Sequence, residues 1–367
     1  MKTVSRIRIA QPMLGDDERR AVLGVLESGQ LAQGRVVAEL EAAFAQWCGV
    51  KHAVAVSSGT AGLHVVLLAH GIKAGDEVIT SPFTFIASAN AALFVGARPV
   101  FCDIDPTTFC LDPDKVEAAI TPKTRAIMPV HLYGYPARMP ELEAIARRHN
   151  LIVIEDACQA HGASINGRKV GGFGGSAVFS LYPSKNMIAG EGGLIATNDD
   201  TVAQLARRLR SHGASATYEH DTLGYNFRLS EMHAAIALSQ LRRLDGFNAA
   251  RRHNGATLTR GLSGVPGIVT PSEEPGYQHV YHQYTLKVPS GRDELQRKLA
   301  ELEVETRVYY PIAVHKQPLY RDLGYHDALP ISERMTREVL SLPVHPGLDA
   351  EDLHRIVEGV WTAQKSG

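Results

Sequence analysis

The sequence has no excess of charge of either sign. Among its 367 residues, 38 Lys and Arg stand against 39 Asp and Glu, which gives a formal net charge of −1. It therefore lacks the basic field that would hold a nucleic acid and the acidic block of a charged tail. Its four cysteines include no C-x-x-C pair, which disfavours a zinc clamp or a disulfide framework. Unpaired cysteines predict a reducing, cytoplasmic location.

Long apolar runs are also missing. The stretch Val78–Ala97 carries no charge, but it contains threonine, serine, proline and asparagine, so we interpret it as buried core rather than a membrane span. Ile9-Ala-Gln-Pro12 stands where an export signal would need its apolar segment, so none is expected. With 44% hydrophobic and 21% charged residues, the composition is that of a globular protein. Its length corresponds to two domains of about 150 residues each.

Between about residues 35 and 245, short apolar runs alternate with helical stretches. This pattern predicts an α/β fold, in which a mainly parallel seven-stranded sheet has helices on both faces. The predicted strands are Ala53–Val56, Glu77–Thr80, Arg98–Asp103, Ala126–Pro129, Leu151–Glu155, Ala177–Ser180 and Gly193–Thr197. The predicted helices are Thr60–His70, Ala87–Val95, Asp114–Ile120, Met139–His149 and Thr201–His212.

After Asp245 the pattern changes, and we predict a second, smaller α+β domain. Its predicted elements are a basic helix Leu244–Leu262, a strand His279–Val288, a helix Arg292–Leu302, a strand Thr306–Tyr310 and a final helix from about Ala350. The large domain would cover residues 1–245 and the small domain residues 246–367. A further helix, Gly15–Ser28, packs on one of the two, and the sequence does not indicate which.

An acid and a lysine form the most informative pair. The apolar run that starts at Leu151 ends in two carboxylates, Glu155 and Asp156. Lys185 follows 29 residues after Asp156 in a proline-containing loop. In α/β sheets the carboxyl ends of strands share one crevice, so both side chains can enter it. A buried lysine beside a carboxylate indicates Schiff-base chemistry. Taken singly, the two residues are more typical of a helix-capping aspartate and a solvated lysine.

A third segment changes that balance. In Ser57-Ser-Gly-Thr-Ala-Gly62 a strand passes through a Ser/Gly turn into a helix, whose free N–H groups suit a phosphate, although such turns also start ordinary helices. A phosphate cradle, an acid, an imine-forming lysine and the flat side chain of Phe85 together indicate pyridoxal 5'-phosphate. Asp156 would keep the pyridine nitrogen protonated, so that the ring acts as an electron sink. Lys185 would hold the aldehyde and later carry the proton.

These residues lie in segments that resemble the DegT/StrS family of sugar aminotransferases, which are fold-type-I enzymes that use pyridoxal 5'-phosphate. The matching segments are Ser57–Gly62, Asp76–Phe85, Pro129–Gly134, Glu155–Gly162, Phe179–Asn186, Gly190–Gly193 and Leu223–Arg228. The likeness runs from about residue 10 to the C-terminus, in the family's order and spacing. The departures are mild: Cys158 stands where alanine is usual, and Ser184 where threonine is common.

The resemblance implies roles around the cofactor. Lys185 would form the internal aldimine, Asp156 would face the pyridine nitrogen, and Gln159 would lie near the ring and its 3'-hydroxyl. The residues implied to bind the rest of the cofactor are Gly59, Thr60, the Ala61 backbone and Ser180, the last three at the phosphate, and Phe85, which would stack on the ring.

The resemblance also implies a homodimer with composite active sites, because the segment that ends at Arg228 reaches the neighbouring subunit in this family. Asn226 would contact the partner's phosphate and Arg228 its substrate. His315 lies in a loop that faces the substrate in the family, which makes it a candidate substrate contact. His131 and His161 receive no catalytic role.

We predict an aminotransferase that moves an amino group from an amino acid, with L-glutamate as the expected donor, to a keto carbon of a nucleotide-linked deoxysugar by a ping-pong mechanism. Lys185 argues against related dehydratases that have histidine there. The loop Val308–Gln317 resembles those of 3-amino-sugar enzymes. A cyclitol or other cyclic ketone is the alternative acceptor, and a non-catalytic regulator is the alternative of another class.

No metal site is predicted despite sixteen histidines. His279 and His282 stand three apart in a predicted strand and would face opposite ways, and the sequence contains no H-E-x-x-H helix. No nucleic-acid or membrane partner is expected.

Overall fold

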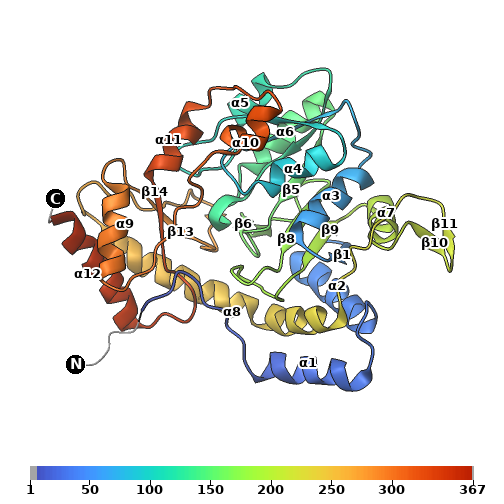
Figure 1. Cartoon of the computed structure of the whole chain (residues 1–367), viewed down its shortest axis with the longest axis horizontal. Coiled ribbons are helices and arrows are strands. Elements are labelled where there is room, and N and C mark those ends of the chain that lie inside the picture. Colours follow the sequence, from blue (N-terminus) through green and yellow to red (C-terminus); the bar gives the residue numbers. More distant parts are fainter. Residues whose placement is uncertain (1–5, 366–367) are drawn as a thin grey trace.

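A seven-stranded sheet forms the centre of the larger unit (Figure 1). The structure is a computed structural model that describes residues 6–365; residues 1–5 and 366–367, which belong to the two predicted domains, lie outside the described part. In spatial order the strands are β1 (His52–Val56), β9 (Gly193–Thr197), β8 (Ser176–Ser180), β5 (Ile152–Asp156), β4 (Thr124–Met128), β2 (Glu77–Thr80) and β3 (Arg98–Phe101). All neighbours run parallel except β9, which is antiparallel to β1 and β8. The predicted mainly parallel sheet is confirmed.

Helices cover both faces of this sheet. The helices around it are α2 (Arg35–Cys48), α3 (Gly59–Ala69), α4 (Ala87–Phe94), α5 (Pro113–Ala118), α6 (Met139–His149) and α7 (Asp200–Arg210). In β1, Val54 and Val56 pack toward α3 and α7, whereas Ala53 and Ala55 pack toward α2. Alternate residues of a strand point to opposite faces, so a strand covered on both sides must be apolar throughout. The helices α3 to α7 lie within two residues of their predicted ends.

The long helix α8 (Glu231–Leu262) begins earlier than the predicted start at Leu244, so that prediction is wrong. The Ser230 hydroxyl accepts a hydrogen bond from the His233 N–H and caps the helix. The buried Glu231 carboxylate accepts hydrogen bonds from the N–H groups at the start of α2, including those of Val36 and Val37 at 2.8 Å. The Glu231 carboxylate therefore lies at the start of α8 and also satisfies the first N–H groups of α2, which joins segments nearly 200 residues apart in the chain.

The predicted boundary at residue 245 falls inside α8, which runs through both units in Figure 1. The division into two domains therefore stays a prediction. The helix α1 (Asp16–Ser28) lies along α8, and its buried Glu18 accepts hydrogen bonds from Gln240 Nε2 at 2.7 Å and Arg243 Nη1 at 3.1 Å. This contact settles which element the N-terminal helix packs against.

The C-terminal unit contains the antiparallel pair β13 (Tyr284–Lys287) and β14 (Val339–Leu342), packed with α9 (Arg292–Glu301) and α12 (Ala350–Lys365). The predicted strand from His279 is shorter than expected, because Tyr281 has a φ of 44°, outside the strand region. The predicted strand Thr306–Tyr310 is wrong: Arg307 forms an isolated bridge with Ser341, and Pro311 has no N–H with which to extend a ladder.

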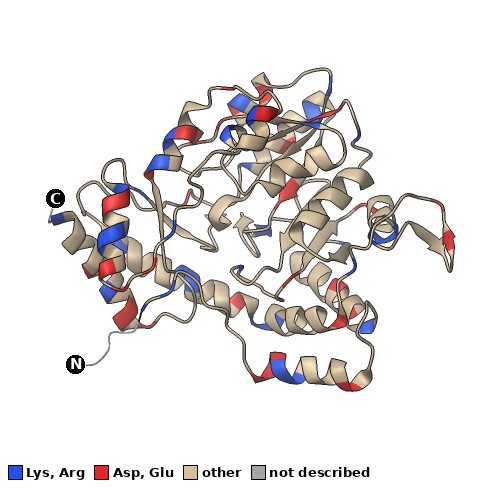
Figure 2. Cartoon of the chain, viewed as in Figure 1, with Lys and Arg blue, Asp and Glu red and all other residues tan. Residues whose placement is uncertain are grey.

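The remaining short elements surround these two units. They are β6 (Ser164–Ile165), β7 (Arg168–Lys169), β10 (Ala214–Ala216), β11 (Glu219–His220), β12 (Tyr277–Gln278), η1 (Leu132–Gly134), η2 (Val314–Lys316), α10 (Pro318–Asp322) and α11 (Pro330–Glu338). Figure 2 shows charges of both signs interspersed over the outer helices. Within residues 6–365, no helix is long and apolar enough to cross a membrane.

Candidate active site

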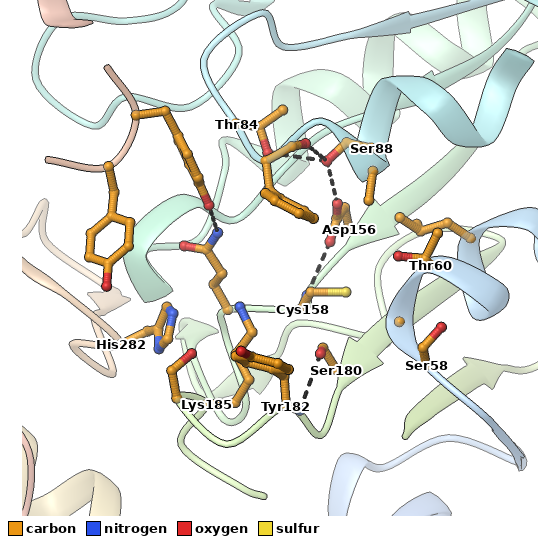
Figure 3. A pocket seen from close by; sticks show the side chains of 18 of the residues that line it. Ser58, Thr60, Thr84, Ser88, Asp156, Cys158, Ser180, Tyr182, Lys185 and His282 are labelled. Carbon is orange, nitrogen blue, oxygen red and sulfur yellow. Dashed lines mark hydrogen bonds between the residues drawn. The ribbon is translucent and has the colours of Figure 1, made fainter. Parts of the chain in front are cut away.

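A cavity of about 430 Å³ lies where the segments that follow β1, β2, β5 and β8 converge. These four strands run parallel to one another, so their carboxyl ends lie at one edge of the sheet, the usual place for a ligand in an α/β fold. Figure 3 shows the side chains that point into it. The cavity brings together the predicted residues Gly59, Thr60, Phe85, Asp156, Gln159, Ser180 and Lys185.

Lys185 is partly buried and enters the cavity from the loop after β8. Burial lowers the pKa of its amine from the ordinary 10.5, and the nearby Cys158 and Asp156 only partly oppose this shift. A lysine with a lowered pKa is a neutral nucleophile at lower pH than a solvated one. The position therefore favours attack of the amine on a carbonyl.

Asp156, the last residue of β5, has both carboxylate oxygens engaged (Figure 3). Ser88 Oγ on α4 donates to Oδ2 at 2.6 Å, and the Cys158 N–H donates to Oδ1 at 3.2 Å. Thr84 Oγ1 lies 3.1 Å from Ser88 Oγ and extends the network. Hydrogen bonds to the charged form stabilise a carboxylate and fix its direction. The carboxylate is therefore held in a fixed orientation at the cavity wall.

The start of α3 forms another wall of the cavity. The N–H of Ala61, a predicted phosphate contact, donates to Ser58 Oγ at 3.0 Å, and Ala61 does not line the cavity. In the described part of the chain, the N–H groups of Gly59 and Thr60 have no acceptor. A Cβ at Gly59 would lie 2.9 Å from Cys158 Sγ and 3.0 Å from Ser180 Cβ, so a larger residue would displace one of these cavity side chains. Two free donors at a helix N-terminus suit an anion.

Phe85 and Gln159 complete the cavity. The Phe85 side chain is 56% exposed, with its ring centroid 6.3 Å from that of Tyr310, so it offers an open face to a flat ligand. Gln159 is fixed at both ends of its amide: Oε1 accepts from the Tyr133 N–H at 2.9 Å, and Nε2 donates to the Tyr310 hydroxyl at 3.1 Å.

Four predicted site residues do not line this cavity: Ala61, described above, and Asn226, Arg228 and His315. Asn226 and Arg228 are exposed and do not line it. His315 is fully buried, and its Nε2 lies 3.1 Å from Glu333 Oε1. A substrate contact by His315 stays a prediction, and it would require this pair to separate.

The two histidines that received no catalytic role have structural surroundings. His131 is buried and joins the Ala137 N–H to the Glu155 carboxylate, with Nε2 3.0 Å from Glu155 Oε2. His161 is buried with its ring 5.2 Å from that of Phe179. Neither lines the cavity.

Sequence reasoning missed several residues that line the cavity, notably Ser88, His282, Tyr309 and Tyr310. The sequence pattern places His282 in a strand and suggests for it only the metal-ligand role rejected above, whereas in the structure it lies in an irregular segment before β13. The two tyrosines were assigned to a strand or to a loop of unknown conformation. Their approach depends on long-range packing that no local pattern reveals.

Comparisons with known proteins agree with this geometry. The family model described as the DegT/DnrJ/EryC1/StrS aminotransferase family matches residues 12–361. The chain belongs to this family. The resemblance drawn from the sequence is thus confirmed, and the protein is a pyridoxal 5'-phosphate-dependent transaminase of fold type I.

Individual relatives in the family are similar over nearly their whole length. The chain is 47% identical to the "Pleiotropic regulatory protein" of Geobacillus stearothermophilus over 92% of this chain and 91% of that one. It is 42% identical to the "UDP-N-acetyl-3-dehydro-alpha-D-glucosamine 3-aminotranferase" of Acidithiobacillus ferrooxidans over 94% and 92%. A solved structure of DesV from S. venezuelae in complex with a ketimine intermediate has a TM-score of 0.94 and 39% identity, covering 98% of each chain.

The cavity of this aminotransferase fits the family's cofactor. The free donors of Gly59 and Thr60 suit the phosphate, and the open Phe85 ring suits the pyridine face. The fixed Asp156 carboxylate suits a ring nitrogen, and the Lys185 amine suits the aldehyde.

The lowered pKa of Lys185 predicts a pH-dependent stability of the cofactor-free protein. The folded protein disfavours the ammonium, so it is penalised at pH 7, and the penalty disappears as the pH approaches 10.5. We expect Lys185→Met to raise the urea midpoint at pH 7, with a gain that shrinks as the pH rises. Lys115→Met, at an exposed lysine, is the control and should show no such trend. A lower midpoint at pH 7 for Lys185→Met would contradict the assignment.

Proposed function

We propose that the protein transfers an amino group from L-glutamate to a keto carbon of a nucleotide-linked deoxysugar in a ping-pong cycle. The observation that carries this proposal is the convergence of Lys185, Asp156 and the free N–H groups of α3 on one cavity. The relative from A. ferrooxidans, named as a 3-aminotransferase for a UDP-linked keto sugar, supports a nucleotide-linked acceptor and amination at C3.

Pyridoxal 5'-phosphate, when bound, supplies an aldehyde that condenses with amines and a ring that withdraws electrons from the adjacent carbon. The Nζ of Lys185 takes a proton from the donor's alpha carbon. It then gives the proton to another carbon of the reacting molecule. Asp156 would face the ring nitrogen of that group, and Ser88 keeps its carboxylate in place. Gln159, fixed at both ends of its amide, orients the group that binds beside it.

We propose further that two chains share each site. Asn226 and Arg228 are exposed and lie outside their own cavity, which leaves them available to a second copy. They follow the hairpin β10–β11, which projects from the body of the chain in Figure 1 and carries the exposed Tyr218. The guanidinium fork of Arg228 suits a donor carboxylate or a sugar diphosphate of the partner's substrate.

Two alternatives remain for this cavity. A cyclitol or other cyclic ketone would use the same cofactor residues, so the acceptor decides between it and a sugar. The name of the G. stearothermophilus relative favours a regulatory role. Lys185, Asp156 and Gln159, which a regulator would not need, favour the enzyme.

A cytoplasmic location stays a prediction from four cysteines that are all free.

The cofactor-loaded protein should aminate a nucleotide-linked keto sugar with L-glutamate as donor. The experiment offers a panel of nucleotide-linked 3- and 4-keto sugars and keto cyclitols and detects the amino product by mass spectrometry. Lys185→Ala should lower the rate by about 10⁴-fold, because the nucleophile and the proton carrier are lost together. Lys115→Ala, at an exposed lysine, should keep the full rate. Conversion of a cyclitol alone, or an active Lys185→Ala variant, would refute the proposal.

Mixing two inactive variants tests the shared site. If Asn226 serves the partner's cavity, an Asn226→Ala chain and a Lys185→Ala chain form a heterodimer with one intact site. Random mixing should then restore about one quarter of the wild-type activity. If each chain used its own Asn226, both sites of the heterodimer would be damaged and no activity would return.

A further inference from the structure

His282 is a buried histidine that lines the cavity and has no role in the scheme above. It is 5% exposed, and its Nδ1 has no hydrogen-bond partner within residues 6–365. Its Nε2 has only a long contact, 3.5 Å to Gln283 Nε2. A buried polar nitrogen without a partner costs free energy, and such atoms are rare in folded proteins. Because His282 lines the cavity and its Nε2 has only this long contact, the imidazole has hydrogen-bonding capacity that the described residues leave unused.

The position of His282 separates it from the cofactor-binding groups. Figure 3 shows its imidazole beside Lys185, on the side away from Asp156, Thr60 and Ser180. Those three residues line the part of the cavity that fits the ring nitrogen and the phosphate. The space on the other side of Lys185 is left for the molecule that reacts there.

A buried arginine holds the turn that carries His282. Arg251 on α8 is 5% exposed, and its Nη1 donates to the carbonyls of Tyr281 at 3.0 Å and His282 at 3.4 Å. Among the described residues, no carboxylate lies within ion-pair distance of its guanidinium. Burying an unpaired cation is costly, and Tyr281 adopts a φ of 44°, which is uncommon for its type. The unpaired guanidinium of Arg251 and the backbone strain at Tyr281 both cost free energy, and the hydrogen bonds of Arg251 hold the turn that carries His282.

The charge state of His282 indicates what it can bind. Burial lowers its pKa well below the ordinary 6.5, and the neighbouring Lys185 and Arg251 charges, with His161 and His279, add to the shift. Near pH 7 the imidazole is neutral, so it can donate one hydrogen bond and accept another. It therefore suits a hydroxyl or a carbonyl better than the carboxylates of an amino-acid donor.

We propose that His282 is a substrate-binding catalytic residue whose imidazole hydrogen bonds to a hydroxyl or carbonyl oxygen of the keto sugar near the carbon that is aminated. The proposal deepens the proposed function and rests on it. The bond orients the keto carbon, and no bond is broken at the histidine. It distinguishes the amino acceptor from the amino donor, which lacks the sugar oxygens.

The two halves of the ping-pong cycle can be measured separately on the holoenzyme by the absorbance of the cofactor. His282→Phe keeps a ring of similar size without hydrogen bonds. It should slow the half-reaction with the keto sugar by roughly 10- to 100-fold, the loss expected for a hydrogen bond to substrate. The half-reaction with L-glutamate should change by less than about threefold. His282→Gln, whose amide nitrogen can stand near the position of Nε2, should recover part of the loss.

A matched control is His161→Gln, since His161 is also buried near Lys185 but does not line the cavity. It should affect both half-reactions alike. Equal effects of His282→Phe on both half-reactions, or no effect on either, would overturn the proposal. If the wild-type protein reacts with L-glutamate but with no keto sugar, the proposed function itself fails and the proposal fails with it. The wild-type result thus distinguishes the two failures.

Discussion

A lysine and an aspartate face one cavity without neutralising each other, and the chemistry of the site depends on this arrangement. Within the described residues no salt bridge joins Lys185 to Asp156, and the two oxygens of Asp156 are engaged by Ser88 and Cys158 instead. A direct ion pair would raise the pKa of the lysine and remove its nucleophilic form. Because the acid is satisfied by neutral donors, burial can lower the pKa of the amine, and both groups stay available to one ligand.

The sheet produces this arrangement through close packing. The neighbouring parallel strands β5 and β8 end at Asp156 and Ser180, and the loop after β8 delivers Lys185. Glycines let α3 approach the same edge. A Cβ at Gly62 would lie 2.6 Å from Val178 Cγ1, and one at Gly193 would lie 2.6 Å from the Ser58 carbonyl oxygen. Bulk at either position would push the start of α3, with its two free N–H groups, away from the cavity.

Local patterns were sufficient for the sheet and for α3 to α7, because strands covered on both faces are short apolar runs bounded by turns. They were insufficient where distant contacts decide. The start of α8 depends on the Ser230 cap and on Glu231, which binds the beginning of α2. The strand predicted to begin at His279 begins later because of the turn at Tyr281. The grouping of Lys185 and Asp156 was predictable from strand ends. The position of His282 at the cavity was not predictable, since the turn that carries it is held by Arg251 on α8.

All of this chemistry requires that the amine of Lys185 carries the cofactor. The most direct test is borohydride reduction of the pyridoxal 5'-phosphate-loaded protein, followed by peptide mass mapping. We expect one phosphopyridoxyl group per chain, on the peptide that contains Lys185, with bleaching of the cofactor colour. A label on a different lysine, or none on a fully active protein, would contradict it.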